Sequence, residues 1–337
     1  GNDNDYDAES GDDIMFQNEG IERNNGMAGF DWAIHKGHEQ AADSDMTITI
    51  FQNQQNNILR DRFDMVEGLS GWNYDDKLTG RDVAMGAFDA NGNAAQIQPG
   101  APLESYSNAL LEKNLHLIDG LADLVAQLEP TDVLGADGKT EKVVMDTSDG
   151  SDIILGGAGS DTIAGGGGND IIDGDKWLNV RIRIKAVDDD GNPLLEEGKQ
   201  VYYTTDGMDS KIYREVDYVK GEVVAGAQPL FGGKTLQQTM FDRTLNPGQL
   251  SIVREIVDGG KDGDIDVASF WDVRENYNIS RNEDGSITVE HVTVSVVPNP
   301  TTGGNRVSDG IDRLTNIEKL KFADQTIDLS PPTLELD

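Results

Sequence analysis

The sequence contains no cysteine, so it can form neither a disulfide framework nor a thiol nucleophile. Basic residues are also scarce. There are 27 lysines and arginines against 62 aspartates and glutamates, which gives a formal net charge of −35. A chain this acidic lacks the basic face that nucleic-acid binding requires. Its self-repulsion opposes compaction unless something neutralises it, and we expect bound calcium to do so.

Long apolar runs are absent as well. No stretch approaches the roughly eighteen residues of a membrane-spanning helix, and the N-terminus does not read as a signal peptide. The chain begins Gly-Asn-Asp without methionine, inside what reads as a repeat, so we expect it to be a piece of a larger protein. With 36% hydrophobic residues it can still bury the cores of two or three structural units.

Common catalytic signatures are missing. The sequence has neither the HExxH of zinc proteases nor the GxSxG of lipases, since residues 68–72 (Gly-Leu-Ser-Gly-Trp) fail at the last place. His35 and His38, with Glu39, could hold zinc, but no second ligand pair follows at a suitable spacing. Solvated loop histidines are the simpler interpretation. We therefore expect no enzymatic activity in this segment.

A tandem repeat is the strongest feature that is present. Residues 147–173 read TSDGSDIIL, GGAGSDTIA and GGGGNDIID, three nine-residue units without a gap. Every unit has glycine in the fourth place, aspartate in the sixth and isoleucine in the eighth. This phase is typical of a calcium-loaded parallel β-roll. A flexible glycine-rich linker is the alternative, but a linker does not require isoleucine at every ninth residue.

The spacing has a chemical reason. Glycines turn the backbone tightly and leave carbonyls pointing outward, and the following aspartate adds a carboxylate to the oxygen ligands that calcium prefers. Two units form one coil, so Asp152 and Asp170 are predicted to flank an ion on one edge and Asp161 to lie on the opposite edge. The predicted metal-binding residues of this segment are Asp152, Asp161, Asp170, Gly150, Gly156, Gly157, Gly159, Gly165, Gly166 and Gly168.

Further units lie outside the tandem segment. Residues 8–16 and 307–315 keep the phase, and residues 71–80 keep it without the second and fourth glycines, which leaves a calcium site there an open question. These units add the candidate metal-binding residues Gly11, Asp13, Asp76, Gly310 and Asp312. An acidic cluster at residues 258–266 has a broken phase, and a plain loop is the favoured interpretation there.

These nonapeptides resemble the repeats of RTX proteins, which are calcium-binding proteins exported by Gram-negative bacteria. The tandem match covers 27 of the 337 residues. The resemblance implies that turn carbonyls and sixth-place aspartates bind calcium ions, and that the β-roll orders only when calcium is present. It also implies type I secretion and an extracellular location.

A second resemblance is weaker but broader. Residues 20–32 (GIERNNGMAGFDW), 59–72 (from LRDRF to GW) and 174–180 (GDKWLNV) are similar to a region of large bacterial haem peroxidases of the animal type. That region lies downstream of the catalytic domain in proteins that carry RTX repeats. The resemblance implies a peroxidase as the parent protein, but the matching segments hold no haem-ligating residue.

The predicted fold is mainly β with some α. It is an interrupted calcium-binding parallel β-roll with inserted helical and β-hairpin segments. Four segments are expected: a 1–100 segment with degenerate turns, a 101–146 helical insert, a 147–175 tandem roll, and a 176–337 α+β region with a terminal unit. Helices are expected at 105–129, 234–243 and 249–257, and a strand at 45–51. The alternative is that the isolated turns lie in separate folds.

These features favour an extracellular calcium-binding structural module that folds when calcium binds. Two alternatives remain open. One is an accessory, non-catalytic region of a secreted haem peroxidase. The other is an adhesin or matrix segment that binds a cell-surface partner.

Overall fold

The computed structural model describes residues 3–27, 29–50, 59–82, 114–126, 131–134, 140–143, 150–188, 190–299 and 305–329. The chain divides into two compact units. The first holds residues 1–116, 122–177 and 258–337, and the second holds residues 117–121 and 178–257. This grouping cuts the chain differently from the four expected segments, because strands after residue 258 share sheets with strands before residue 82. The secondary structure is mainly β with few helices.

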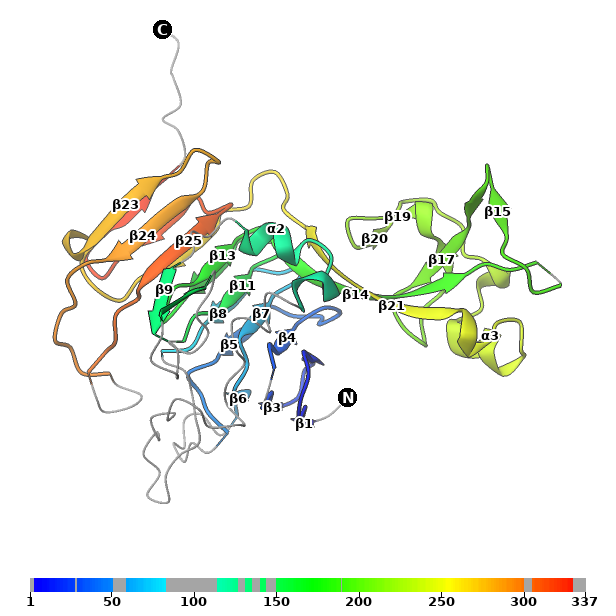
Figure 1. The fold of residues 1–337 in the computed structure, drawn as a ribbon, viewed down its shortest axis with the longest axis horizontal. Helices are drawn as coiled ribbons and strands as arrows, with labels where there is room; N and C mark the ends of the chain where they lie inside the picture. Colours follow the sequence, from blue (N-terminus) through cyan, green and yellow to red (C-terminus); the bar gives the residue numbers. More distant parts are fainter. Residues whose placement is uncertain are drawn as a thin grey trace, which may run out of the picture. The chain divides into compact units, whose positions relative to one another are not determined.

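The largest sheet of the first unit has eight strands (Figure 1). In spatial order they are β2 (Ile14–Phe16), β4 (Trp32–Ile34), β7 (Gly68–Ser70), β11 (Ile153–Leu155), β13 (Ile171–Asp173), β25 (Ile311–Thr315), β24 (Ile287–His291) and β23 (Tyr277–Arg281). The first six strands run parallel, and β24 and β23 are antiparallel. The isolated units at 8–16 and 307–315 therefore lead into the same sheet as the first and third tandem repeats.

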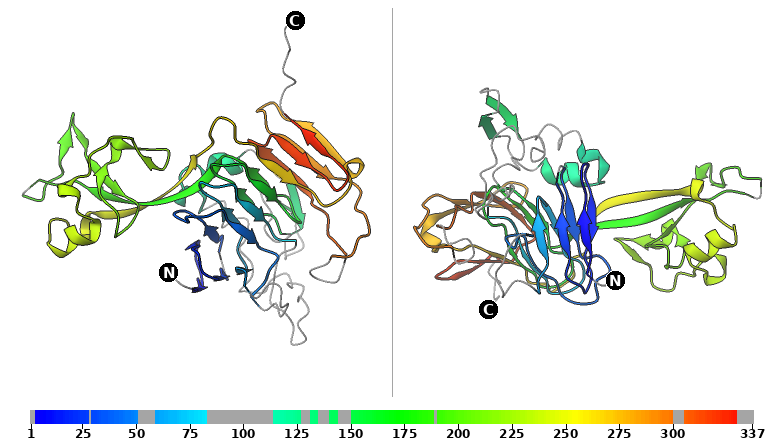
Figure 2. Two further views of the ribbon diagram at one scale, coloured as in Figure 1. Left: turned by 180° about the vertical axis from the view of Figure 1, so that it is seen from behind. Right: turned by 90° about the horizontal axis from the view of Figure 1, so that it is seen from below.

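A six-stranded sheet and a three-stranded sheet also belong to this unit. The six strands in order are β27 (Thr326–Asp328), β26 (Lys319–Lys321), β22 (Val267–Ser269), β12 (Thr162–Ala164), β8 (Lys77–Thr79) and β5 (Asp43–Asp45). All are parallel except the pair β26 and β27. The three parallel strands are β1 (Asp5–Asp7), β3 (Arg23–Asn25) and β6 (Arg62–Asp64). Figure 2 shows the blue N-terminal strands at one end of the stack and the orange and red strands at the other.

The core of the first unit is built from the eighth places of the repeats. Ile154 lies directly beside Ile172 in the eight-stranded sheet, whereas Ile163 lies in the six-stranded sheet. All three side chains are fully buried. The same register places Leu69 beside Ile154 and Leu78 beside Ile163. Because successive side chains of a strand point to opposite faces, each of these five strands places its middle, apolar residue in the core.

The second unit departs from a turn of the first. The chain leaves after Asp175 and returns at Gly259, whose amide donates a 2.8 Å hydrogen bond to the Asp175 carbonyl. Its sheet has the order β18 (Tyr213–Arg214), β17 (Tyr202–Thr205), β14 (Lys176–Lys185) and β21 (Leu250–Asp258). Two short hairpins accompany it, β15 (Leu195–Glu196) with β16 (Lys199–Gln200) and β19 (Tyr218–Val219) with β20 (Glu222–Val223).

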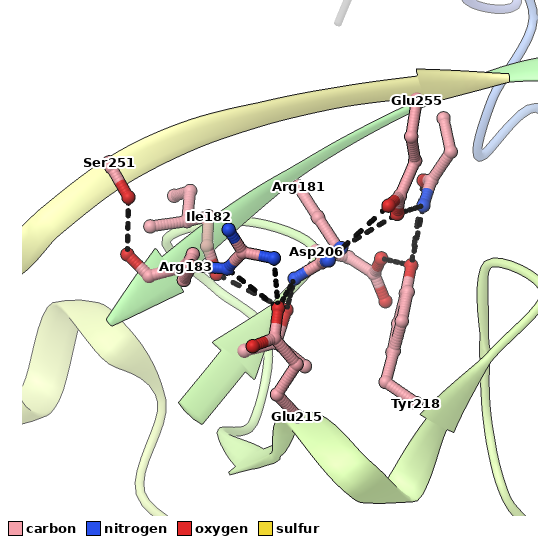
Figure 3. Close-up of polar contacts among 10 residues, drawn as sticks. Arg181, Ile182, Arg183, Asp206, Glu215, Tyr218, Ser251 and Glu255 are labelled. Atoms are coloured by element: carbon pink, nitrogen blue, oxygen red, sulfur yellow. Dashed lines mark hydrogen bonds and ion pairs between the residues drawn. The ribbon is translucent and has the colours of Figure 1, made fainter. Parts of the chain in front are cut away.

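An ion-pair network organises the polar side of this second unit (Figure 3). Arg181 on β14 is 6% exposed and lies between Glu255, 2.7 Å from its Nε, and Glu215, 2.8 Å from its Nη1. Arg183 contacts the same Glu215 carboxylate at 2.6 Å. These contacts pair the buried charge of Arg181, as burial requires. The small apolar core consists of Ile184, Ile212, Leu236 and Leu245.

Short helices lie in two of the three segments where the sequence predicts helices. The described part of 105–129 holds η2 (Leu115–Leu117) and α2 (Leu121–Val125), divided at Gly120, whose φ is +86°. Residues 105–113 and 127–129 lie outside the described residues. The helix expected at 234–243 is α3 (Leu236–Phe241), capped by Thr235. Among the described residues, none of the helices has the length and hydropathy needed to cross a bilayer.

Two expected elements are wrong. The segment expected as a helix at 249–257 is instead strand β21 from Leu250 onward, because its β-branched residues suit an extended chain beside β14. The strand expected at 45–51 is β5, which already ends at Asp45. The Asp45 Oδ1 atom accepts the amide of Thr47 at 3.0 Å and bends the chain, so that Met46 and Ile48 turn into the core.

The remaining short elements of the described residues complete the list. They are β9 (Thr131–Leu134) paired antiparallel with β10 (Thr140–Val143), η4 (Glu215–Asp217), η5 (Phe231–Gly233), η6 (Pro247–Gln249) and η7 (Arg274–Asn276).

Candidate metal centre

An acidic residue directly precedes five of the six parallel strands of the eight-stranded sheet, and in the sixth, β25, Asp312 is the second residue. We call this row the first ladder, and in spatial order its members are Asp13, Asp31, Glu67, Asp152, Asp170 and Asp312. Backbone amides link neighbouring rungs. The Asp152 amide donates to Oδ1 of Asp170 at 2.8 Å, and the Asp170 amide donates to Oδ1 of Asp312 at 3.0 Å. Residues 142 positions apart in the sequence are thereby adjacent in the ladder.

The six-stranded sheet has the same arrangement, which we call the second ladder. Its members are Asp76, Asp161, Asp266 and Glu318. The Asp76 amide donates to Oδ1 of Asp161 at 2.6 Å, and the Asp161 amide donates to Oδ1 of Asp266 at 2.7 Å. The Asp266 amide in turn donates to Oε2 of Glu318 at 2.8 Å. Asp161 therefore lies in the other sheet from Asp152 and Asp170, as the two-unit coil predicts.

Eight of the ten ladder carboxylates are buried, Asp13 and Glu318 being half-buried, and burial changes their protonation. It raises the pKa of Asp161 to about 8, with a further contribution from the charges of Asp76 and Asp266. Burial and the neighbouring Glu67 raise the pKa of Asp31 to about 9. Burial likewise raises the pKa of Asp266 to about 7. Anions packed this closely are costly unless a cation neutralises them.

Glycines at the first places of the repeats open a space beside these carboxylates. A Cβ atom added to Gly156 would lie 2.4 Å from Oδ2 of Asp161 and 2.4 Å from the carbonyl oxygen of Gly174. A Cβ on Gly71 would lie 2.3 Å from Oδ2 of Asp76 and 2.2 Å from the carbonyl oxygen of Gly156. Carboxylate and carbonyl oxygens thus converge on positions that only glycine leaves open.

In the space beside Gly156, Oδ2 of Asp161 is placed to bind a ligand. Oδ1 of Asp161 accepts an amide, but Oδ2 is buried and has no hydrogen-bond partner in the part of the chain that the structure describes. The same holds for Oδ2 of Asp31. Hard oxygen ligands of this kind fit calcium. Within the described ranges no three His, Asp or Glu side chains gather around one point, so a cation would depend chiefly on backbone carbonyls.

The structure brings most predicted site residues to these two edges. Asp152, Asp170, Asp13 and Asp312 lie in the first ladder, and Asp161 and Asp76 lie in the second. The predicted glycines lie in the adjoining turns. Gly157 and Gly159, with φ of +111° and +131°, approach the carbonyls of Trp72 and Tyr74. The other predicted glycines in these turns are Gly11, Gly150, Gly156, Gly165, Gly166, Gly168 and Gly310.

Sequence reasoning missed four of the ladder residues, Asp31, Glu67, Asp266 and Glu318. A signal existed for Asp31, which lies eighteen residues after Asp13 in a unit (residues 26–34) with glycine in its first and fourth places. Asp266 belongs to the acidic cluster whose phase is broken. The second unit separates it from Gly174, the first-place glycine whose Cβ would lie 2.6 Å from Oδ2 of Asp266.

One rung of the first ladder contains a basic residue. Arg81 lies between Glu67 and Asp152, and its side chain is 4% exposed. Its Nε donates to Oδ1 of Asp152 at 2.7 Å, and its Nη1 lies 3.3 Å from Oε1 of Glu67. Burial raises the pKa of Asp152, and the Arg81 charge acts against that rise.

Comparison with known families identifies the repeat segment. Residues 146–176 match the family model described as RTX calcium-binding nonapeptide repeat, in four copies. These residues carry RTX calcium-binding repeats. No curated protein and no solved structure matches the chain. RTX nonapeptide repeats are calcium-binding motifs, so calcium is the cofactor of this segment.

RTX repeat domains are generally structural and not catalytic. Proteins that carry them are typically secreted by Gram-negative bacteria. The segments that resemble the peroxidase-associated region supply strands β3, β4, β6 and β7 of the stacked sheets and the start of β14. The link to a peroxidase parent remains a hypothesis.

Proposed function

We propose that the first unit is an extracellular calcium-binding module of a larger secreted RTX protein, and that it acts as a parallel β-roll whose coils close on calcium. The recurrence of one pairing supports this most directly. A first-place glycine faces a sixth-place carboxylate at Gly26 and Asp31, Gly71 and Asp76, Gly156 and Asp161, and Gly165 and Asp170. The pairing therefore extends well beyond residues 146–176.

Calcium binding and folding are coupled in this proposal. The fold places Asp161, Asp170 and Asp31 where water cannot solvate their charges. Calcium neutralises them at the moment the coils close, so the free energy of metal binding contributes directly to folding. The net charge of −35 acts in the same direction, since it expands the chain until cations reduce it. The site would fill after export, where calcium is abundant.

Circular dichroism during a calcium titration tests the proposal. The chain is first stripped of metal with a chelator and dialysed. We expect β-structure to appear cooperatively at calcium concentrations of about 0.1–1 mM, the range of extracellular calcium modules. Magnesium is the control, because it demands octahedral geometry and gives up its water reluctantly. Equal spectra with and without calcium, or an equal response to magnesium, would contradict the proposal.

A further inference from the structure

Arg81 completes a rung of the first ladder that differs from the others. Its backbone amide donates to Oδ2 of Asp152 at 2.6 Å, while its Nε binds Oδ1 of the same carboxylate at 2.7 Å. Its Nη2 donates to the Ser151 carbonyl at 2.9 Å, and its Nη1 reaches Oε1 of Glu67. One guanidinium thus engages two carboxylates and one peptide carbonyl. These are the ligand types that a calcium ion takes.

The turn that contains Arg81 is assembled from two parts of the chain. Gly80 and Arg81 fill its first and second places, while Gly150, Ser151 and Asp152 fill the fourth to sixth places. A Cβ on Gly80 would lie 2.7 Å from Oδ2 of Asp152 and 1.9 Å from the Gly165 carbonyl. The oxygens of a glycine-lined calcium position are therefore present, although 71 residues separate Arg81 from Asp152.

Asp161 provides an internal comparison. It takes the same sixth place as Asp152, and both residues are fully buried. Oδ2 of Asp161 has no hydrogen-bond partner within the described residues, whereas both oxygens of Asp152 are bonded by Arg81. The charged groups around Asp161 are the carboxylates of Asp75, Asp76 and Asp266. Asp152 thus already has a cationic partner in Arg81, whereas Asp161 is surrounded by anions.

We infer that Arg81 is a built-in counter-ion that occupies one calcium position of the first ladder and closes the divided turn without metal. The inference rests on the proposed function, because it concerns which of the repeat turns need calcium. A guanidinium suits the task because it stays charged at all relevant pH values and its planar donors match a carboxylate edge. Arg81 follows strand β8 closely and bonds Asp152 directly. It can therefore hold the two parts of the divided turn together before a calcium ion binds.

The inference predicts that removing Arg81 creates a calcium site. Arg81→Gly places glycine in the second place, as Gly157 and Gly166 do in intact repeats. Without the guanidinium, Asp152 and Glu67 remain as buried anions, and calcium is the cation available to neutralise them. We expect Arg81→Gly to bind one calcium ion more per chain than the parent, counted by equilibrium dialysis of the full chain with elemental analysis. Its calcium-saturated circular dichroism should equal that of the parent.

Two further variants test whether the added calcium ion binds at Asp152. Arg181→Gln removes an equally buried arginine that is paired with Glu215 and Glu255 in the second unit, and should leave the count unchanged. The double variant Arg81→Gly with Asp152→Asn should return to the parent count, because the carboxylate that holds the added ion is gone. An added ion that persists in the double variant would overturn the assignment.

The other outcomes are equally decisive. Arg81→Gly that binds the same number of ions as the parent, or that stays unfolded at saturating calcium, overturns the role of Arg81 while the proposed function stands. A parent chain that binds no calcium overturns the proposed function and, with it, this inference. The two failures are therefore distinguished by the parent count alone.

Discussion

The backbone amide of Asp13 donates a 2.8 Å hydrogen bond to Oδ1 of Asp31, eighteen residues later in the chain. Oδ2 of Asp31 is buried and lacks a hydrogen-bond partner among the described residues. The two oxygens of one carboxylate therefore have different tasks. One links neighbouring coils through its hydrogen bond, and in our proposal the other binds a cation. Substitutions that separate these tasks test the calcium proposal most directly.

Asp161→Asn keeps the oxygen that accepts the Asp76 amide but removes the charge. We expect the apparent calcium affinity to fall by roughly tenfold, or about 1.4 kcal/mol, because a neutral amide is a poorer ligand for a hard cation. The melting temperature should fall in calcium and should stay equal or rise slightly without it, since a buried charge is gone. Calcium titration and thermal melts in both conditions measure this.

Asp209→Asn is the matched control, because Asp209 is exposed in the second unit. It should leave both melting temperatures within error of the parent. If Asp161→Asn lowered stability equally with and without calcium, its role would be structural and independent of the metal.

The nine-residue phase predicts much of the first unit, and the reason is geometric. A coil made of two repeats returns to the same edge every eighteen residues, so Asp152 and Asp170 had to be neighbours and Asp161 had to face the other way. The eighth-place isoleucines fix which side is buried. Even the divergent unit at residues 8–16 joins the same sheet.

Other features of the structure cannot be predicted from the sequence, for physical reasons. Glu67 takes a sixth place without any glycine before it, so nothing in its segment marks a turn. Asp266 is separated from Gly174 by the second unit, and a periodic pattern cannot bridge an insertion of that size. The apolar residues of strand β21 also fit a helical spacing, so the sequence alone predicts a helix there. The segment is a strand because it pairs with β14, and the local sequence does not reveal such a tertiary contact.

Gly156→Ala should disrupt the second ladder sterically. Its Cβ would lie 2.4 Å from both Oδ2 of Asp161 and the Gly174 carbonyl, so either the turn moves or the ion position closes. We expect at least a tenfold loss of calcium affinity at this position and a lower melting temperature in calcium. Gly207→Ala is the control, since its nearest neighbour is Oγ of Ser210 at 4.0 Å. Parent-like calcium binding by Gly156→Ala would show that the space beside Asp161 is not used.

Ile172→Ala tests the packing beneath the ladders. Ile172 is fully buried between Ile154 and Leu314. Its truncation should cost about 2–5 kcal/mol of unfolding free energy, through lost burial and the cavity left behind. Denaturant unfolding in saturating calcium measures it. Ile252→Ala, at a position that is 54% exposed, should change stability by less than about 0.5 kcal/mol. Similar losses for both would contradict the position of the core.

Lower pH should stabilise the metal-free fold but should weaken the binding of calcium. In the metal-free fold burial raises the pKa of Asp161 to about 8 and that of Asp31 to about 9, from an ordinary value of 3.8. Between about pH 4 and pH 9 the folded chain therefore holds more protons than the unfolded chain. The stability that these groups contribute is complete below about pH 4 and is lost as pH rises through 8 to 9.

His35 is buried, which makes the interpretation as a solvated loop histidine wrong, and it works against this trend at the acidic end. Burial lowers its pKa to about 3, so the folded form loses stability as pH falls below the ordinary value of 6.5. The raised carboxyls outnumber it. We therefore expect the chelated chain to gain β-structure by circular dichroism when pH falls from 8 to about 5.5, and the calcium midpoint to move to higher concentration because protons compete for the same oxygens. A metal-free chain that orders as pH rises over this range would show that the ladder carboxylates are not desolvated as described.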